Sequence, residues 1–294
     1  MYNALHMASL ISLGQVIDKT IFHYKKHFLE LVSITAWIVV AAVPAALAKL
    51  LAPFAQGTGT ETTTPQLLLS LLNDAGAILL GVVSAWALIT VIIAVSEEAS
   101  GAPRDIKARS KKAWKLFFSY LWISILLVLI SSVILIPPVA GFALVFIDTL
   151  RGTTTVLSSV GGVLMLFGTL VSFILLVRYT IQYGFAPYSL ILDDKRGTKA
   201  LKHSSDLVTG RWWATFFRFV LPKVLYSLVV IVLNFVLLAA LAIFLMIVLG
   251  ETLTTQGVGN AVWFLLSTAI TALMVPLIAV TDYHIYDSLR SSRS

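Results

Sequence analysis

The chain has 294 residues, of which 59% are hydrophobic and only 12% are charged, and its mean hydropathy is +0.94. An ordinary soluble domain is about a quarter charged, so this composition excludes a soluble globular protein. The absence of cysteine excludes disulfides, thiolate nucleophiles and cysteine metal sites. In a chain this apolar, the net charge of +7 is interpreted first as a signal of membrane topology.

Six apolar stretches are each long enough to form a membrane-spanning helix, which needs about 20 residues. They cover residues 28–52, 66–95, 114–147, 153–192, 212–249 and 258–289. The excess length predicts tilted or kinked helices, because proline interrupts the helical hydrogen-bond ladder. The expected kink points are Pro44, Pro137 with Pro138, Pro187, Pro222 and Pro276. The fold class predicted is all-α, polytopic and six-spanning.

Basic residues collect in alternate connectors, and positive charge near membrane helices is retained on the cytoplasmic side. The connector between the second and third spans and the one between the fourth and fifth hold five each: Arg104, Lys107, Arg109, Lys111 and Lys112 in the first, and Lys195, Arg196, Lys199, Lys202 and Arg211 in the second. The opposite loops, residues 53–65, 148–155 and 250–257, contain Arg151 as their only basic residue. The sequence therefore predicts a multi-pass membrane protein with both termini in the cytoplasm.

A weak threefold repeat is expected within a single integral membrane domain. A glycine, a short amphipathic segment and an aromatic residue precede each pair of spans, as in Gly14 to Phe28, Gly101 to Trp114 and Gly197 to Trp212. The repeat units are approximately 1–96, 97–192 and 193–294. Two of the segments show apolar residues at helical spacing, whereas the second, 105–115, is more basic and could be partly loop.

Ionisable residues lie near the predicted cytoplasmic ends of the spans, and two interpretations remain open. Long side chains can reach the interface individually, which would also account for Lys223. Alternatively, five residues meet in a polar cluster that gates a cavity or holds a lipid phosphate. The five are Glu30, Glu97, Arg178, Arg218 and Asp282. Asn234, deep in the fifth span, is expected to form a hydrogen bond between helices rather than to bind a ligand.

Neither a metal site nor a cofactor site is predicted. His23, His27 and Glu30 share a spacing that could place them on one helical face, but Lys25 and Lys26 lie between them and argue against a cation. The spacing of serine, histidine and acidic residues does not indicate a catalytic nucleophile with its base, so no catalytic residue is assigned. Gly161, Gly162 and Gly168 are expected to permit close helix packing.

A motif in the second half of the chain resembles a known group of proteins. It runs from Phe185-Ala186-Pro187-Tyr188 through Asp193-Asp194 and Gly197 to Ala200-Leu201, Ser204 and Gly210-Arg211-Trp212, and Tyr286-Asp287 follows later. These residues resemble a segment of uncharacterised prokaryotic six-helix membrane proteins, which are similar to the membrane domain attached to some glycerophosphodiester phosphodiesterases. The resemblance implies a fold and a location in a prokaryotic plasma (inner) membrane, and no catalytic residue is carried over from it.

The function expected is non-enzymatic: scaffolding, assembly with partners, or organisation of lipid at the cytoplasmic leaflet. The predicted partners are membrane lipids, in particular anionic ones, with a protein partner or a second copy also considered and nucleic acid excluded. The candidate lipid-headgroup contacts are Lys107, Lys111, Lys112, Lys199, Lys202 and Arg211. The alternative is a transporter or flippase for a hydrophobic or amphiphilic substrate.

Overall fold

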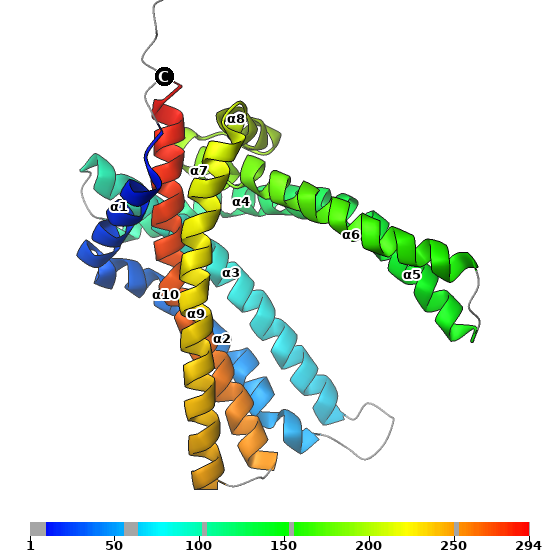
Figure 1. Cartoon of the computed structure of the whole chain (residues 1–294). Helices are drawn as coiled ribbons and strands as arrows, with labels where there is room; N and C mark the ends of the chain where they lie inside the picture. The colour runs from blue at the N-terminus through cyan, green and yellow to red at the C-terminus, as the bar shows by residue number, and fades with distance from the viewer. Residues whose placement is uncertain (1–9, 56–63, 102–104, 153–155, 250–252, 294) are drawn as a thin grey trace, which may run out of the picture. The chain divides into compact units, whose positions relative to one another are not determined.

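The computed structural model of the chain describes residues 10–55, 64–101, 105–152, 156–249 and 253–293. Within them the fold is all-α and no strand occurs (Figure 1). The helices are α1 (Leu13–Lys26), α2 (Phe28–Leu51), α3 (Thr64–Ser100), α4 (Ile106–Ile134), α5 (Ile136–Leu150), α6 (Val156–Tyr183), α7 (Ala186–Asp193), α8 (Thr198–Val208), α9 (Trp212–Leu249) and α10 (Leu253–Ser291), with a short 3-10 turn at Ala52–Ala55.

Six of the described helical segments are long and apolar enough to cross a membrane. They are Phe28–Ala55, Thr64–Ser100, Ile106–Ile134, Val156–Asp193, Trp212–Val248 and Gln256–Ser291. Many large apolar side chains on these segments are exposed. For example, 72% of the Phe235 surface and 78% of the Ile247 surface are accessible. Such a surface would be unstable in water and suits a lipid environment. The prediction of an all-α, multi-pass membrane protein is confirmed.

The chain divides into two compact units. The first takes the chain up to Phe117 and again from Phe217 to Ser292, and the second takes Phe118–Phe216 with Arg293. These boundaries differ from those of the predicted repeat at residues 96 and 192. A separate short helix precedes a hairpin in the first and third copies, as α1 and α8, whereas the second predicted segment is continuous with α4, and the threefold repeat stays a prediction.

The first unit packs α2 against α3 and α10 through small side chains. Alanines of α2 such as Ala42 and Ala45 are buried, and a Cβ on Gly76 of α3 would lie 2.6 Å from the Ala45 nitrogen. This close approach explains why glycine faces alanine here. Helix α9 runs beside α10 (Figure 1), where the Ser267 hydroxyl donates to the Asn234 side-chain oxygen at 2.9 Å. The expected hydrogen bond between helices at Asn234 is therefore confirmed.

The second unit is built on a long interrupted hairpin in which α4 and α5 together run antiparallel to α6. Tyr179 donates to the carbonyl of Leu127, and Ser172 donates to the carbonyl of Ile134. The Ile134 carbonyl needs this partner because Pro138, four residues on, has no N–H to donate. The predicted third span is thus divided at Leu135, as the expected kink at Pro137 and Pro138 requires.

The predicted fourth span is also interrupted, between Tyr183 and Ala186, as the expected kink at Pro187 requires. Pro187 lies in the first turn of α7, where its missing N–H costs nothing. By contrast, α2, α9 and α10 continue through Pro44, Pro222 and Pro276.

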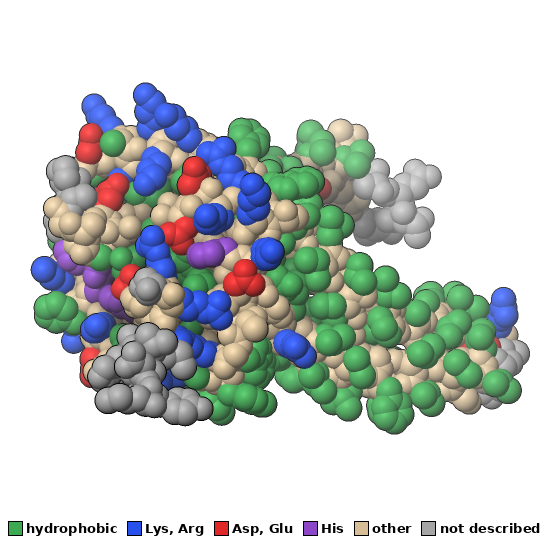
Figure 2. Space-filling model, turned by 90° about the horizontal axis from the view of Figure 1, so that it is seen from above, with side chains coloured by type: hydrophobic (Ala, Val, Ile, Leu, Met, Phe, Trp, Pro, Cys, Tyr) green, Lys and Arg blue, Asp and Glu red, His purple; other side chains and the backbone are tan. Residues whose placement is uncertain are grey.

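Short helices and helix starts at one end of the spans position the polar side chains. Ser12 and Gln15 form a capping box that starts α1. Asp105 accepts the Ala108 N–H at 3.0 Å and so starts α4, which makes the segment after residue 105 fully helical rather than partly loop. Hydrophobic side chains dominate the visible surface, while Lys, Arg, Asp, Glu and His side chains gather in one part of it (Figure 2).

Candidate functional site

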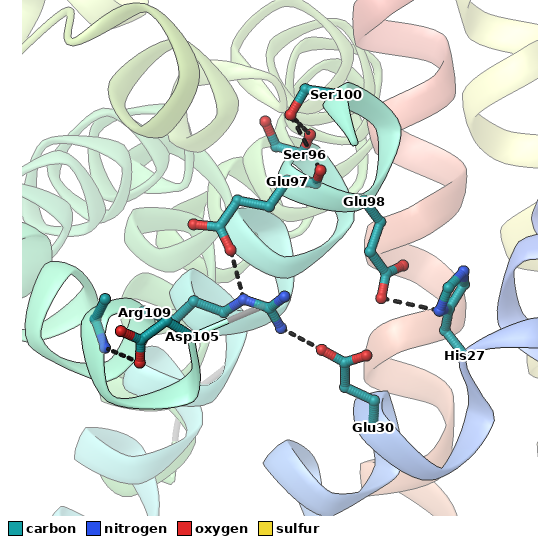
Figure 3. Close-up of polar contacts among 9 residues, drawn as sticks. His27, Glu30, Ser96, Glu97, Glu98, Ser100, Asp105 and Arg109 are labelled. Atoms are coloured by element: carbon teal, nitrogen blue, oxygen red, sulfur yellow. Dashed lines mark hydrogen bonds and ion pairs between the residues drawn. The ribbon is translucent and has the colours of Figure 1, made fainter. Parts of the chain in front are cut away.

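Arg109 is the centre of a charge network in the first unit. It lies in the first turn of α4 and is 2% exposed. Its Nη1 pairs with Glu30 of α2 and its Nε pairs with Glu97 of α3 (Figure 3). A buried guanidinium is tolerated only when carboxylates compensate its charge, and the planar fork can serve two of them at once. Arg109 therefore ties three helices together at their polar ends.

Two histidines and Glu98 form a second cluster in the same unit. His23 Nε2 lies 2.9 Å from Glu98 Oε2, and His27 Nδ1 lies 3.0 Å from Glu98 Oε1. The Glu98 side chain is only 4% exposed and comes from the last turns of α3. Glu30 is within hydrogen-bonding reach of Glu98, so this cluster adjoins the Arg109 network (Figure 3). The spacing in the sequence suggested Glu30 as the carboxylate beside the two histidines, whereas the structure places Glu98 there.

A separate ion pair links α9 to α10. Lys223 Nζ lies 2.9 Å from Asp282 Oδ1, and the lysine also lies over the ring of Phe219. Asp282 is buried, which differs from a side chain that simply reaches water. The pair satisfies two charges that would otherwise be costly inside an apolar bundle.

The five residues of the predicted polar cluster are thus distributed over several partners. Glu30 and Glu97 meet at Arg109, and Asp282 pairs with Lys223. Arg218 Nε donates to the carbonyl of Ile11, just before α1. Arg178 belongs to the second unit, where it is exposed. A single cluster of all five residues stays a prediction. Two of its members, Glu30 and Glu97, are joined by Arg109.

The predicted lipid contacts are placed at the starts of α4, α8 and α9. The lysines Lys107, Lys111, Lys112, Lys199 and Lys202 are exposed, and Arg211 is half-buried just before α9. Lys107 and Lys111 stand out because they line a defined hollow. The other predicted lysines contribute to a generally basic surface.

That hollow has a volume of about 520 Å³ and lies within the first unit. Three indole rings line it, from Trp37 of α2, Trp86 of α3 and Trp114 of α4, together with Lys107 and Lys111. The Trp86 Nε1 atom is buried and has no hydrogen-bond partner among the described residues. Buried indole N–H groups normally find an acceptor, so this N–H is an unsatisfied donor next to the hollow.

A second cavity of about 590 Å³ lies within the second unit. Its walls are largely apolar, with Phe173, Val177 and Phe216 among the lining residues, and Arg178 stands at its polar part. Its shape and chemistry suit an amphiphile that has an apolar chain and an anionic group.

Comparison with protein-family models, with curated proteins and with solved structures finds no match for this chain. The resemblance to six-helix membrane proteins and to the membrane domain of some glycerophosphodiester phosphodiesterases therefore stays a prediction.

Three functional candidates were missed in the sequence. Arg109 was counted among the basic residues of a connector, because a topology argument treats all of them alike. Glu98 lies just after the second predicted span and Trp86 lies within it, and neither was assigned a role. An arginine placed one turn after a capping aspartate, facing the start of a long apolar helix, is the signal that could have singled out Arg109.

Proposed function

We propose that this chain is a non-enzymatic, multi-pass membrane protein that binds anionic lipid at the cytoplasmic leaflet and organises it there. The observation that carries the proposal is the hollow formed by Trp37, Trp86, Trp114, Lys107 and Lys111. Two ammonium groups supply positive charge, and three indoles supply amphipathic walls of the kind found at membrane interfaces.

The donors in the hollow match a lipid phosphate. Each exposed lysine near an anionic surface contributes about 1 kcal/mol, which is attraction without selectivity. The Trp86 N–H has no acceptor among the described residues, and a turn of the indole toward the hollow would let it donate to a phosphate or ester oxygen. The combination favours a bound anionic headgroup over diffuse attraction to the surface.

The charge distribution supports the accompanying topology. Lys107, Lys111 and Lys112 are exposed at the start of α4, and Lys199 and Lys202 are exposed on α8. Both groups would face the cytoplasm, with the two termini on the same side, in a prokaryotic inner membrane. The resemblance to a family of prokaryotic six-helix membrane proteins points in the same direction.

Native mass spectrometry of protein in nanodiscs of mixed phosphatidylglycerol and phosphatidylcholine tests the proposal. We expect the wild type to retain phosphatidylglycerol and the variant Trp86→Phe, which loses only the N–H and some ring area, to retain less. The double variant Lys107→Gln with Lys111→Gln should retain at least about tenfold less. The matched control is Lys25→Gln with Lys26→Gln, which removes the same charge from exposed residues of α1 outside the hollow.

Equal losses in the two double variants would overturn a built site and leave only general attraction. Retention of phosphatidylcholine in the same amount as phosphatidylglycerol would overturn the selectivity for anionic lipid.

A transporter or flippase for an amphiphilic substrate is the second candidate, favoured by the cavity of the second unit. Its apolar walls and Arg178 could accept one amphiphile at a time. Transport of a fluorescent anionic lipid across reconstituted vesicles, lost in Arg178→Gln and kept in Arg151→Gln, would support this candidate. Absence of transport in the wild type would remove it.

A further inference from the structure

Three metal-ligating side chains meet in the first unit outside the proposed lipid site. His23 belongs to the last turn of α1, His27 to the junction between α1 and α2, and Glu98 to α3. Their donor atoms, two imidazole nitrogens and a carboxylate oxygen, all lie within 4.8 Å of one another. The spacing of His23 and His27 by one helical turn puts both rings on the same side of the chain, with ring centroids 4.9 Å apart.

A third histidine lies next to this group. His284 of α10 has its ring centroid 6.1 Å from that of His23. Its Nε2 atom is buried and has no hydrogen-bond partner among the described residues. A buried, unpartnered imidazole nitrogen beside three potential ligands is an independent sign of a missing partner.

The distances suit a small tetrahedral ion. Zinc binds histidine nitrogen and carboxylate oxygen at about 2.0–2.2 Å, which places neighbouring ligand atoms roughly 3.3 Å apart. The observed separations from Glu98 oxygen to His23 and His27 nitrogen are 2.9 and 3.0 Å. The contacts between the two Glu98 oxygens and the imidazole nitrogens would therefore lengthen by a few tenths of an ångström around an ion, within a group of donor atoms that spans at most 4.8 Å.

The surrounding charges also favour a cation. Glu30, Glu97 and Glu98 carry three negative charges when ionised, against the positive charges of Arg109 and of Lys19, which acts on His284. Glu30 lies between Glu98 and Arg109 and can fix the orientation of the Glu98 carboxylate, as neighbours of metal ligands commonly do. Lys25 and Lys26, which argued against a cation in the sequence, are exposed to solvent and lie outside the group of donors.

We propose that His23, His27 and Glu98 bind a divalent transition-metal ion of the Zn²⁺ type, with His284 or water completing the coordination. Imidazole ligands favour zinc and similar ions over Mg²⁺ and Ca²⁺, which prefer oxygen alone. The ion connects α1, α2 and α3 at their polar ends and holds α1 against the bundle. Its role is structural, since the ligands tie helices together.

The test uses untagged full-length protein, stripped with chelator and dialysed against Zn²⁺, with the bound metal measured by mass spectrometry. We expect about one zinc ion per chain in the wild type. His27→Gln and Glu98→Gln should each weaken binding by more than about a hundredfold, since they remove a direct ligand. His203→Gln, which removes an imidazole from the second unit, is the matched control and should bind as the wild type does.

A measurement on the wild type keeps the test decisive if a variant fails to fold. Titration with Co²⁺ should give the intense visible absorption of a four-coordinate site with nitrogen and oxygen ligands, and Zn²⁺ should displace it. A spectrum typical of hexa-aqua Co²⁺, or zinc bound equally by wild type and His27→Gln, would overturn the proposal and leave a hydrogen-bonded His–Glu–His cluster.

Discussion

Arg109 of α4 pairs with Glu30 of α2, although the two residues are separated by a complete membrane hairpin in the sequence. The guanidinium is buried, and the Glu30 side chain is 18% exposed. The pair fixes the start of α4 against the start of α2. Because Glu97 shares the same guanidinium, α3 is included in the contact.

Replacing Arg109 should destabilise the first unit strongly. Arg109→Met leaves the carboxylates of Glu30 and Glu97 without their cation, and breaking such a pair costs about 3 kcal/mol when the partners are partly exposed. The apparent melting temperature in detergent should fall clearly. The matched control Lys107→Met, which removes an exposed charge from the same turn of α4, should change it little. Equal shifts in the two variants would contradict the structural role of Arg109.

Close packing of α5 on α6 predicts a difference between two adjacent glycines. A Cβ on Gly161 would lie 2.9 Å from the Gly141 carbonyl oxygen, whereas one on Gly162 would meet nothing within 4 Å. Gly161→Ala should therefore separate the helices and lower thermal stability, by about 1–3 kcal/mol. Gly162→Ala should be neutral or slightly stabilising, because alanine favours the helix. Identical melting curves for the two variants would refute this packing.

The hydrogen bond between Ser267 and Asn234 should contribute modestly to the α9–α10 contact. Polar bonds between membrane helices are worth about 0.6 kcal/mol on average and rarely more than about 1.7. A double-mutant cycle of Asn234→Ala and Ser267→Ala, measured by denaturation in mixed micelles, should give a coupling energy in that range. A coupling energy of zero would mean that the two side chains do not interact in the membrane.

The absence of cysteine makes the predicted topology directly testable. Single cysteines at Lys111 and Lys199 should resist a membrane-impermeant maleimide in intact cells and react after permeabilisation. A cysteine at Arg151 should react in intact cells, because its loop is predicted to lie outside. Labelling of Lys111→Cys and Arg151→Cys from the same side would disprove the proposed orientation.

The sequence predicts the elements of this fold well, because hydropathy alone defines helices longer than a bilayer needs. The fifth span was predicted to cover residues 212–249, and α9 is Trp212–Leu249. The interruption at Leu135 could also be predicted, since Pro137 and Pro138 cannot complete the hydrogen-bond ladder.

The polar contacts could not be predicted in the same way. The partner of a buried charge is set by which helix ends meet in space, and the sequence gives no register between α1, α3 and α4. No partner was therefore predicted for Glu98 or Arg109, whereas the structure buries both side chains against residues distant in the sequence. The same holds for Trp86, because the lack of a hydrogen-bond partner for its N–H among the described residues follows from the three-dimensional environment of the indole.

Site-specific photo-crosslinking tests the central claim of anionic-lipid binding most directly. A photoreactive amino acid at Ile106, which lines the hollow and is 71% exposed, is compared with one at Phe22, which is 70% exposed on α1 outside it. After irradiation in membranes of mixed phospholipids, mass spectrometry identifies the lipid attached at each position. We predict that adducts at Ile106 are enriched in anionic phospholipid relative to those at Phe22. The same headgroup composition at both positions would contradict a lipid site in the hollow.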